Sequence, residues 1–119
     1  MDISKLIKKI KQHSEYGRVG MILCHNGVVR ATSRNGKKVS GLKVSVDNQL
    51  LKKVVEKQKN KPGIIEILVE IDKDRNLLVG DDIMLVVVAG DIRDNVIPVL
   101  TDIINAIKTD VTSKTEFYE

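Results

Sequence analysis

Seven consecutive apolar residues, Ile83 to Ala89, constrain the fold of this 119-residue chain more than any other feature. The run is rich in valine and far too short to cross a bilayer. Such a run is typical of a strand that other elements cover on both faces. We therefore expect Ile83 to Ala89 to form the central strand of a sheet, which Gly90 and Asp91 then end.

The segments around this run predict strands interspersed with helices. Three further strands are expected, over residues 18–25, 39–46 and 64–71, on the evidence of apolar alternation and flanking turn residues. Three helices are expected, over residues 3–12, from an Asp47 cap to about Lys59, and from an Asp91 cap to about Lys108. No linker or repeat divides the chain, so the pattern predicts a single α+β domain over residues 1–119.

Two of the predicted helices carry more detailed expectations. In the middle helix, four apolar residues should face the core: Leu50, Leu51, Val54 and Val55. In the last helix, Pro98 falls inside the apolar pattern, where a proline costs about 3 kcal/mol. We expect a kink or a delayed helix start at that position.

The sequence argues against a metal centre or a reactive thiol. Its single cysteine, Cys24, cannot form an internal disulfide, and one cysteine with two histidines cannot build a structural zinc site alone. His25 follows Cys24 directly, but neighbours on a strand point to opposite faces, which places them badly for a nucleophile and its base. We expect Cys24 to be buried, and we expect no metal.

Composition also limits the possible partners. Aromatic residues are 3% of the chain, whereas a nucleic-acid surface usually interleaves aromatics with basic residues, so we expect no nucleic acid. No apolar run or leader pattern indicates a membrane, and we expect a cytoplasmic protein. The formal charge of +4 permits an anionic partner. Glycine-rich phosphate loops and hydrolase motifs do not occur.

Basic residues near loops and helix ends are the remaining candidates for chemistry. They occur in Gly27-Val28-Val29-Arg30, in Asp91-Ile92-Arg93, and in the segment from Lys108 to Lys114-Thr115-Glu116. Arginine can hold a phosphate with two hydrogen bonds, and lysine supplies a mobile charge or a nucleophilic amine. These basic residues could also have a purely structural role. Arg93 could form an ion pair with Asp94, and the charge of Lys108 could interact favourably with the dipole at the C-terminus of a helix.

The order of these motifs resembles the MoaE family, the large catalytic subunit of molybdopterin synthase. The resemblance runs from about Gly17 to Glu116. The motifs that carry it are Gly27-Val28-Val29-Arg30, Gly36-Lys37-Lys38-Val39, Leu77-Leu78-Val79-Gly80-Asp81, Arg93, Lys108 and Lys114-Thr115-Glu116. It implies an α/β-hammerhead-like α+β domain with a mixed sheet and about three helices.

The resemblance also implies a reaction and its partners. A homodimer would bind two small ubiquitin-like, MoaD-like sulfur carriers, forming a heterotetramer. Sulfur would pass from the carrier's C-terminal thiocarboxylate to cyclic pyranopterin monophosphate, which gives molybdopterin. No cofactor is implied. Such a protein would be a sulfurtransferase of molybdenum cofactor biosynthesis.

By the same resemblance, the basic residues divide into two roles. Lys108 would act on the carrier's acyl group, and Lys114 would assist substrate binding or proton transfer. Arg30 and Arg93 would clamp the phosphate. The neighbours that would complete the substrate site are Val28, Val29, Ile92, Thr115 and Glu116.

Some family features differ in this chain. Ile92-Arg93 stands where the family has His-Arg, and Thr112-Ser113-Lys114 replaces a Pro-x-Trp-Lys segment, with one residue fewer between the two lysines. No aromatic residue occurs between Val44 and Asp47, where a pterin pocket would offer stacking surface. The sequence therefore leaves two hypotheses: a divergent synthase subunit, or a MoaE-like dimeric binding or regulatory module without catalytic activity.

Overall fold

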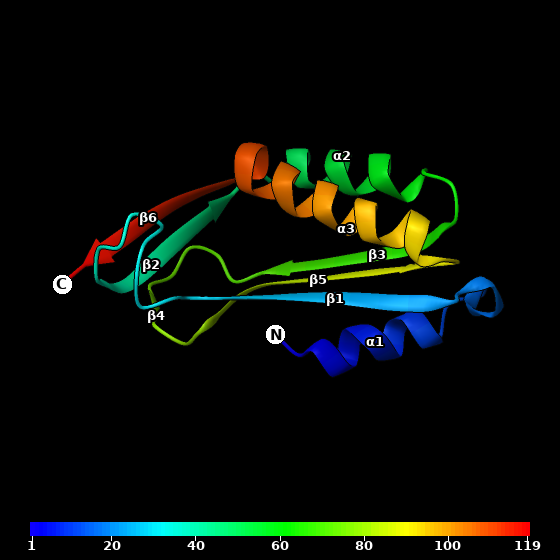
Figure 1. Ribbon diagram of the computed structural model, residues 1–119, viewed down its shortest axis with the longest axis horizontal. Helices are drawn as coiled ribbons and strands as arrows, with labels where there is room; N and C mark the ends of the chain where they lie inside the picture. The colour runs from blue at the N-terminus through cyan, green and yellow to red at the C-terminus, as the bar shows by residue number, and fades with distance from the viewer.

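The apolar run forms the central strand of a sheet, as predicted. In the computed structural model, which describes residues 1–119, β5 (Asp82–Gly90) lies between β1 (Met21–Val28) and β3 (Ile64–Ile71). Both neighbours are antiparallel to β5 (Figure 1). Side chains from Met84 to Ala89 are at most 5% exposed, so β5 is buried on both faces.

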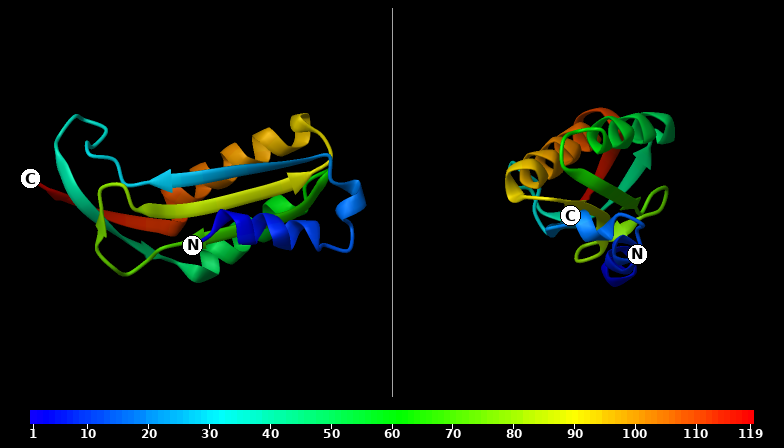
Figure 2. Two further views of the ribbon diagram at one scale, coloured as in Figure 1. Left: turned by 90° about the horizontal axis from the view of Figure 1, so that it is seen from below. Right: turned by 90° about the vertical axis from the view of Figure 1, so that its right-hand side faces the viewer.

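Helices cover the two faces of this first sheet. The side chains of β5 alternate between the faces, so successive valines reach different helices. On one face, Val86 and Val88 pack in a cluster with Ile103 of α3 (Arg93–Ala106), and α2 (Asn48–Lys59) lies beside α3 (Figures 1 and 2). On the other face, α1 (Ile3–Lys11) buries Leu6 and Ile10 against the alternate residues of β5, which are Leu85, Val87 and Ala89.

A second antiparallel sheet extends beyond one end of the first. Its strand order is β4 (Leu77–Leu78), β2 (Val39–Val46) and β6 (Thr112–Tyr118). It gives the molecule an elongated shape, with extents of 49 × 25 × 23 Å (Figure 1). The α+β class and the three helices are confirmed, but all strand pairs are antiparallel rather than mixed. In the first sheet β1 and β3 both run opposite to β5, and in the second sheet β4 and β6 both run opposite to β2.

Most predicted elements lie where the sequence placed them. The strands over 39–46 and 64–71 are confirmed, and Asp47 caps α2 by accepting a hydrogen bond from the backbone N–H of Leu50 at 3.1 Å. The first strand begins at Met21, because the residues Tyr16–Arg18 form a 3₁₀ turn before it.

The start of α3 differs from the prediction. Its N-cap is Ile92, and Asp91 lies one position too early to cap it. The carboxylate of Asp91 instead accepts hydrogen bonds from the backbone N–H of Ile92 and from the side chain of Asn95. The helix continues through Pro98 to Ala106. Pro98 is exposed, so water can satisfy the carbonyl group that its ring leaves without an N–H partner.

Two burial predictions were wrong. Leu50 is 37% exposed, because it lies in the first turn of α2, while Leu51, Val54 and Val55 pack against the core. Cys24 is exposed. It shares a strand face with Ile22, but β1 is an edge strand, and the residues that pack against α1 include Ile22 and not Cys24.

None of the helices combines the length and the apolar character that crossing a bilayer requires.

Candidate functional site

A cavity of about 680 Å³ lies where the two sheets meet. Its apolar lining includes Ile71 of β3, Ile83 and Met84 of β5, and Leu42 and Val44 of β2. The polar rim comes from three segments: the loop after β1, the turn after α3, and β6. Segments far apart in the sequence therefore meet around one hollow.

The polar lining is strongly basic. Four cationic residues from these three segments line the cavity: Arg30, Arg34, Lys108 and Lys114. Glu116 is the single carboxylate among the lining residues. A cavity with this excess of positive charge and partly apolar walls concentrates field lines and favours an anionic ligand.

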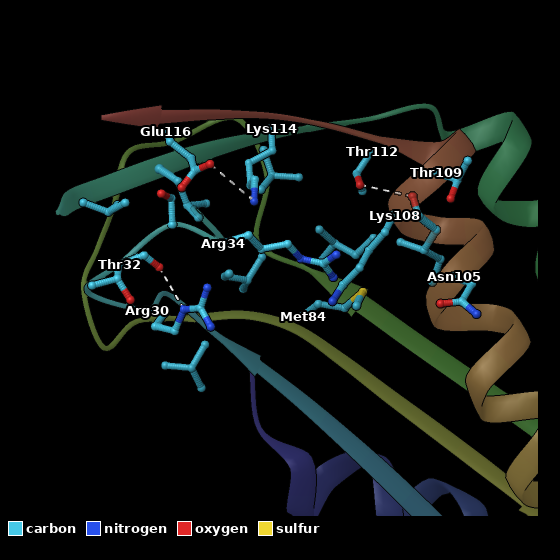
Figure 3. Close-up of a pocket in the computed structure, with 18 residues that line it drawn as sticks. Arg30, Thr32, Arg34, Met84, Asn105, Lys108, Thr109, Thr112, Lys114 and Glu116 are labelled. Atoms are coloured by element: carbon cyan, nitrogen blue, oxygen red, sulfur yellow. Dashed lines mark hydrogen bonds and ion pairs between the residues drawn. The ribbon is translucent and has the colours of Figure 1, made fainter. Parts of the chain in front are cut away.

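Lys108 reaches the cavity from a π-helical turn, Ile107–Val111, that directly follows α3. Ile107 and Val111 anchor this turn in the core, where they are 1% and 3% exposed. π-Helical turns are rare and are frequent at functional sites. The amine of Lys108 forms no hydrogen bond or ion pair within the chain, so its charge is available to a ligand (Figure 3).

Lys114 lines the cavity despite the shortened spacing to Lys108. Side chains alternate along β6, so Lys114 and Glu116 share the cavity face while Thr115 points to the other face. The Nζ atom of Lys114 lies 3.7 Å from Oε1 of Glu116. Two of the three predicted residues of this segment therefore line the cavity, and Thr115 does not.

The predicted Gly27-Val28-Val29-Arg30 segment divides in the same way. Val28 and Arg30 line the cavity, whereas Val29 is 2% exposed and packs in a cluster with Leu42 and Leu77. The Nε atom of Arg30 donates a hydrogen bond to the carbonyl oxygen of Thr32 at 2.8 Å, which fixes the direction of the guanidinium. Val29 thus supports the wall of the cavity from behind.

Arg93 and Ile92 lie away from the cavity within one chain. They stand at the N-terminus of α3, and Lys108 follows its C-terminus. A helix of 14 residues separates the two ends by about 20 Å. A single chain does not bring Arg93 together with Arg30 and Lys108.

His25 lies close enough to Lys108 for the two to interact electrostatically. Its Nε2 atom is buried and has no hydrogen-bond partner. Burial lowers the pKa of His25, and the positive charge of Lys108 lowers it further. Although the Cys24 side chain is exposed, partial desolvation raises the pKa of its thiol, which favours the unreactive protonated form. The neighbouring Cys24 and His25 thus give no sign of a nucleophile and base.

Sequence reasoning missed several polar lining residues. Arg34 is the most important, because it adds a fourth cation; the others are Thr32, Ser33, Asn105, Thr109 and Thr112. The sequence did offer one indication of Arg34, namely that it is a basic residue shortly after Arg30. It was not chosen as a site residue because residues 33–38 have the composition of a turn. No cluster of three or more His, Cys, Asp or Glu side chains is arranged to hold a metal ion.

A family model described as "MoaE protein" matches residues 1–110, and the chain belongs to this family. Membership gives it a role in molybdenum cofactor biosynthesis. A search of curated proteins finds no match.

Solved structures share the fold at low sequence identity. Molybdopterin synthase from Staphylococcus aureus is 22% identical with a TM-score of 0.72, over 90% of this chain and 85% of that one. A complex of subunits 1 and 2 of the molybdopterin-converting factor from Helicobacter pylori is 22% identical with a TM-score of 0.72, and the match covers 99% of this chain and 84% of that one. Molybdopterin cofactor biosynthesis protein E from Burkholderia multivorans is 19% identical with a TM-score of 0.77, and the match covers 100% of this chain and 82% of that one.

Proposed function

We propose that residues 1–119, as a single MoaE-like domain, act as the catalytic subunit of a molybdopterin synthase. The chain would move sulfur from the C-terminal thiocarboxylate of a small ubiquitin-like, MoaD-like carrier to cyclic pyranopterin monophosphate. The observation that supports this most directly is the convergence of Arg30, Lys108 and Lys114 on one cavity. A phosphate-bearing pterin and a thiocarboxylate are both anions, and this lining complements both.

In this proposal, Lys108 acts on the carrier. Its free amine lines the cavity and can attract the anionic thiocarboxylate. The sulfur bonds to a pterin carbon as an oxygen substituent leaves that carbon, which gives a thioester between the carrier and the pterin. Water or the amine of Lys108 then attacks the acyl carbon, and the carbon–sulfur bond breaks, so the sulfur stays on the pterin as a thiolate and the acyl group ends as a carboxylate or as an amide of Lys108. When water attacks, the ammonium group of Lys108 stabilises the negative charge that forms on the acyl oxygen. Lys114 assists substrate binding or proton transfer, and Arg30 binds the phosphate.

The partners follow from the same proposal. The matched Helicobacter pylori structure is a complex of two subunits, which supports a small carrier subunit for this chain. We also propose a homodimer, within a cytoplasmic heterotetramer. Arg93 and Ile92 lie about 20 Å from Lys108 in one chain, so they reach substrate only if a second copy presents them to this cavity.

A second candidate function is a MoaE-like binding or regulatory module without catalysis. The lining of the cavity favours it in one respect, because none of the lining residues is aromatic. A pterin ring would therefore find apolar walls but no stacking partner.

A reconstitution assay separates the two functions. The chain is mixed with a thiocarboxylated carrier and cyclic pyranopterin monophosphate, and dithiolene product is measured. Product from the wild-type chain, and its loss in Lys108→Ala, supports the synthase. Lys38→Gln is the matched control, because Lys38 is an exposed cation that does not line the cavity. Absence of product with every carrier tried would contradict the synthase function and support the non-catalytic module.

A further inference from the structure

Arg34 lines the cavity, and it is not among the residues that the family resemblance assigns to the site. Its side chain extends from the loop after β1 toward Lys108, which approaches from the opposite side (Figure 3). The guanidinium forms no hydrogen bond or ion pair within the chain. Its five N–H donors are therefore available to a ligand.

The loop that carries Arg34 is closed by its own hydrogen bonds. The backbone N–H of Ser33 donates to the carbonyl oxygen of Lys37 at 2.8 Å, and the backbone N–H of Gly36 donates to the carbonyl oxygen of Ser33 at 3.0 Å. The hydroxyl of Ser33, a residue only 7% exposed, accepts a hydrogen bond from the N–H of Lys37 and is hydrogen-bonded to Asn35. Arg34 thus projects from a fixed turn.

The end of β6 holds the same loop from outside. The ammonium group of Lys37 lies 5.5 Å from the ring centre of Tyr118, within cation–π range. The backbone N–H of Glu119 donates to the carbonyl oxygen of Lys38 at 3.3 Å. These contacts reduce the freedom that the loop would lose when a ligand binds, which favours affinity.

Arg34 and Lys108 are the two cavity cations without a partner inside the chain. Arg30 already donates to Thr32, and Lys114 is paired with Glu116. A planar guanidinium and an ammonium group facing one hollow match a phosphate monoester, because arginine can donate two parallel hydrogen bonds and lysine adds charge. We infer that Arg34 is a further substrate-binding residue, which receives the anionic phosphate together with Lys108. The identity of that anion rests on the proposed function, but the position of Arg34 does not.

Inorganic phosphate tests the inference on the chain alone. Binding is followed by NMR titration for the wild type, Arg34→Gln, Arg34→Lys and Lys38→Gln. Loss of a bidentate charged contact should weaken phosphate binding by about tenfold in Arg34→Gln. Arg34→Lys keeps the charge without the planar fork and should fall between the wild type and Arg34→Gln. Lys38→Gln removes the same charge from the same loop outside the cavity and should bind like the wild type.

A second measurement keeps this inference separate from the proposed function. In the reconstituted sulfur-transfer assay, Arg34→Gln should raise KM for the pterin by about tenfold with little change in kcat. If the wild type makes no product but Arg34→Gln still loses phosphate binding, the inference stands and the synthase fails. Equal phosphate binding by Arg34→Gln and the wild type, or no binding by the wild type, would overturn the inference whatever the enzyme does.

Discussion

The ammonium group of Lys114 and the carboxylate of Glu116 lie 3.7 Å apart, two residues from one another on the cavity face of β6. Their side chains are 53% and 21% exposed, so water partly screens the pair. Glu116 is the only acid among the lining residues, and it therefore offsets part of the positive charge that an anion would meet.

Removing this acid should strengthen anion binding. Glu116→Gln leaves Lys114 without its counter-charge, and we expect phosphate to bind about two- to fivefold more tightly at low salt. The gain should shrink at high salt, because exposed charges are screened. NMR titration at two ionic strengths measures it, with Glu119→Gln as a control outside the cavity. Weaker binding by Glu116→Gln would instead mean that the carboxylate holds Lys114 in position.

His25 should make the fold sensitive to mild acid. The pKa of His25 is lowered from its ordinary value of 6.5 in the folded chain. The imidazole of His25 therefore takes up a proton more readily in the unfolded chain than in the folded chain. The corresponding stability is present above pH 6.5 and is lost as the pH falls from there through the lowered pKa. We expect the urea midpoint to drop between about pH 7.5 and about pH 5.5, and to drop less in His25→Phe.

His13→Gln is the control for this pH effect. His13 is the other histidine of the chain and lies 3.8 Å from Glu66, away from the cavity. The variant should keep the acid-side loss of stability that His25 causes. If His25→Phe and the wild type lose the same stability between the two pH values, burial of His25 does not carry this effect.

Gly41 should not tolerate a side chain. A Cβ atom at this position would lie 2.3 Å from the carbonyl oxygen of Leu77, which is backbone of the paired strand β4 and cannot move aside easily. We expect Gly41→Ala to lower the free energy of unfolding by about 1–3 kcal/mol. Gly17→Ala is the matched control, because a Cβ atom there would meet nothing within 4 Å. Urea unfolding of both variants checks the difference, and equal stabilities would contradict the close approach of β2 and β4.

Ile103 should contribute far more to stability than a neighbouring isoleucine of the same helix. Ile103 is fully buried between α3 and the first sheet, and Ile103→Ala should cost about 2–5 kcal/mol. Ile97 is 47% exposed, and Ile97→Ala should cost less than about 1 kcal/mol. Thermal unfolding measures both. Similar losses in the two variants would show that α3 is packed differently from this description.

The elements were predictable where a single stretch of sequence decides the outcome. The run Ile83 to Ala89 leaves no polar face, and its short length with glycines on both sides favours a strand that is covered on both faces. Asp47 caps α2 through a bond to a residue three positions along. Cys24 and Leu50 were misplaced because their exposure depends on how far a helix extends over its neighbours, and no local pattern encodes that distance.

The candidate site was predictable in part. The order of motifs identified Arg30, Lys108 and Lys114, which the fold gathers into one cavity. Arg34 was not predicted as a site residue. The turn residues around it determine only the shape of its loop, whereas contacts with the end of the chain, distant in sequence, help to position the loop at the cavity. The part played by Arg93 stays a prediction, since it depends on a second chain.

The length of the π-helical turn, Ile107–Val111, determines which side chains of β6 face the cavity. A shift of one residue exchanges the two faces of a strand, so the turn decides whether the even-numbered or the odd-numbered residues of β6 point into the cavity. Deleting Thr109 would therefore turn Lys114 and Glu116 outward and bring Ser113 and Thr115 inward, without altering any residue of the strand itself. A relative with one more residue between its two lysines must absorb it in a bulge or a wider turn to keep its second lysine facing inward.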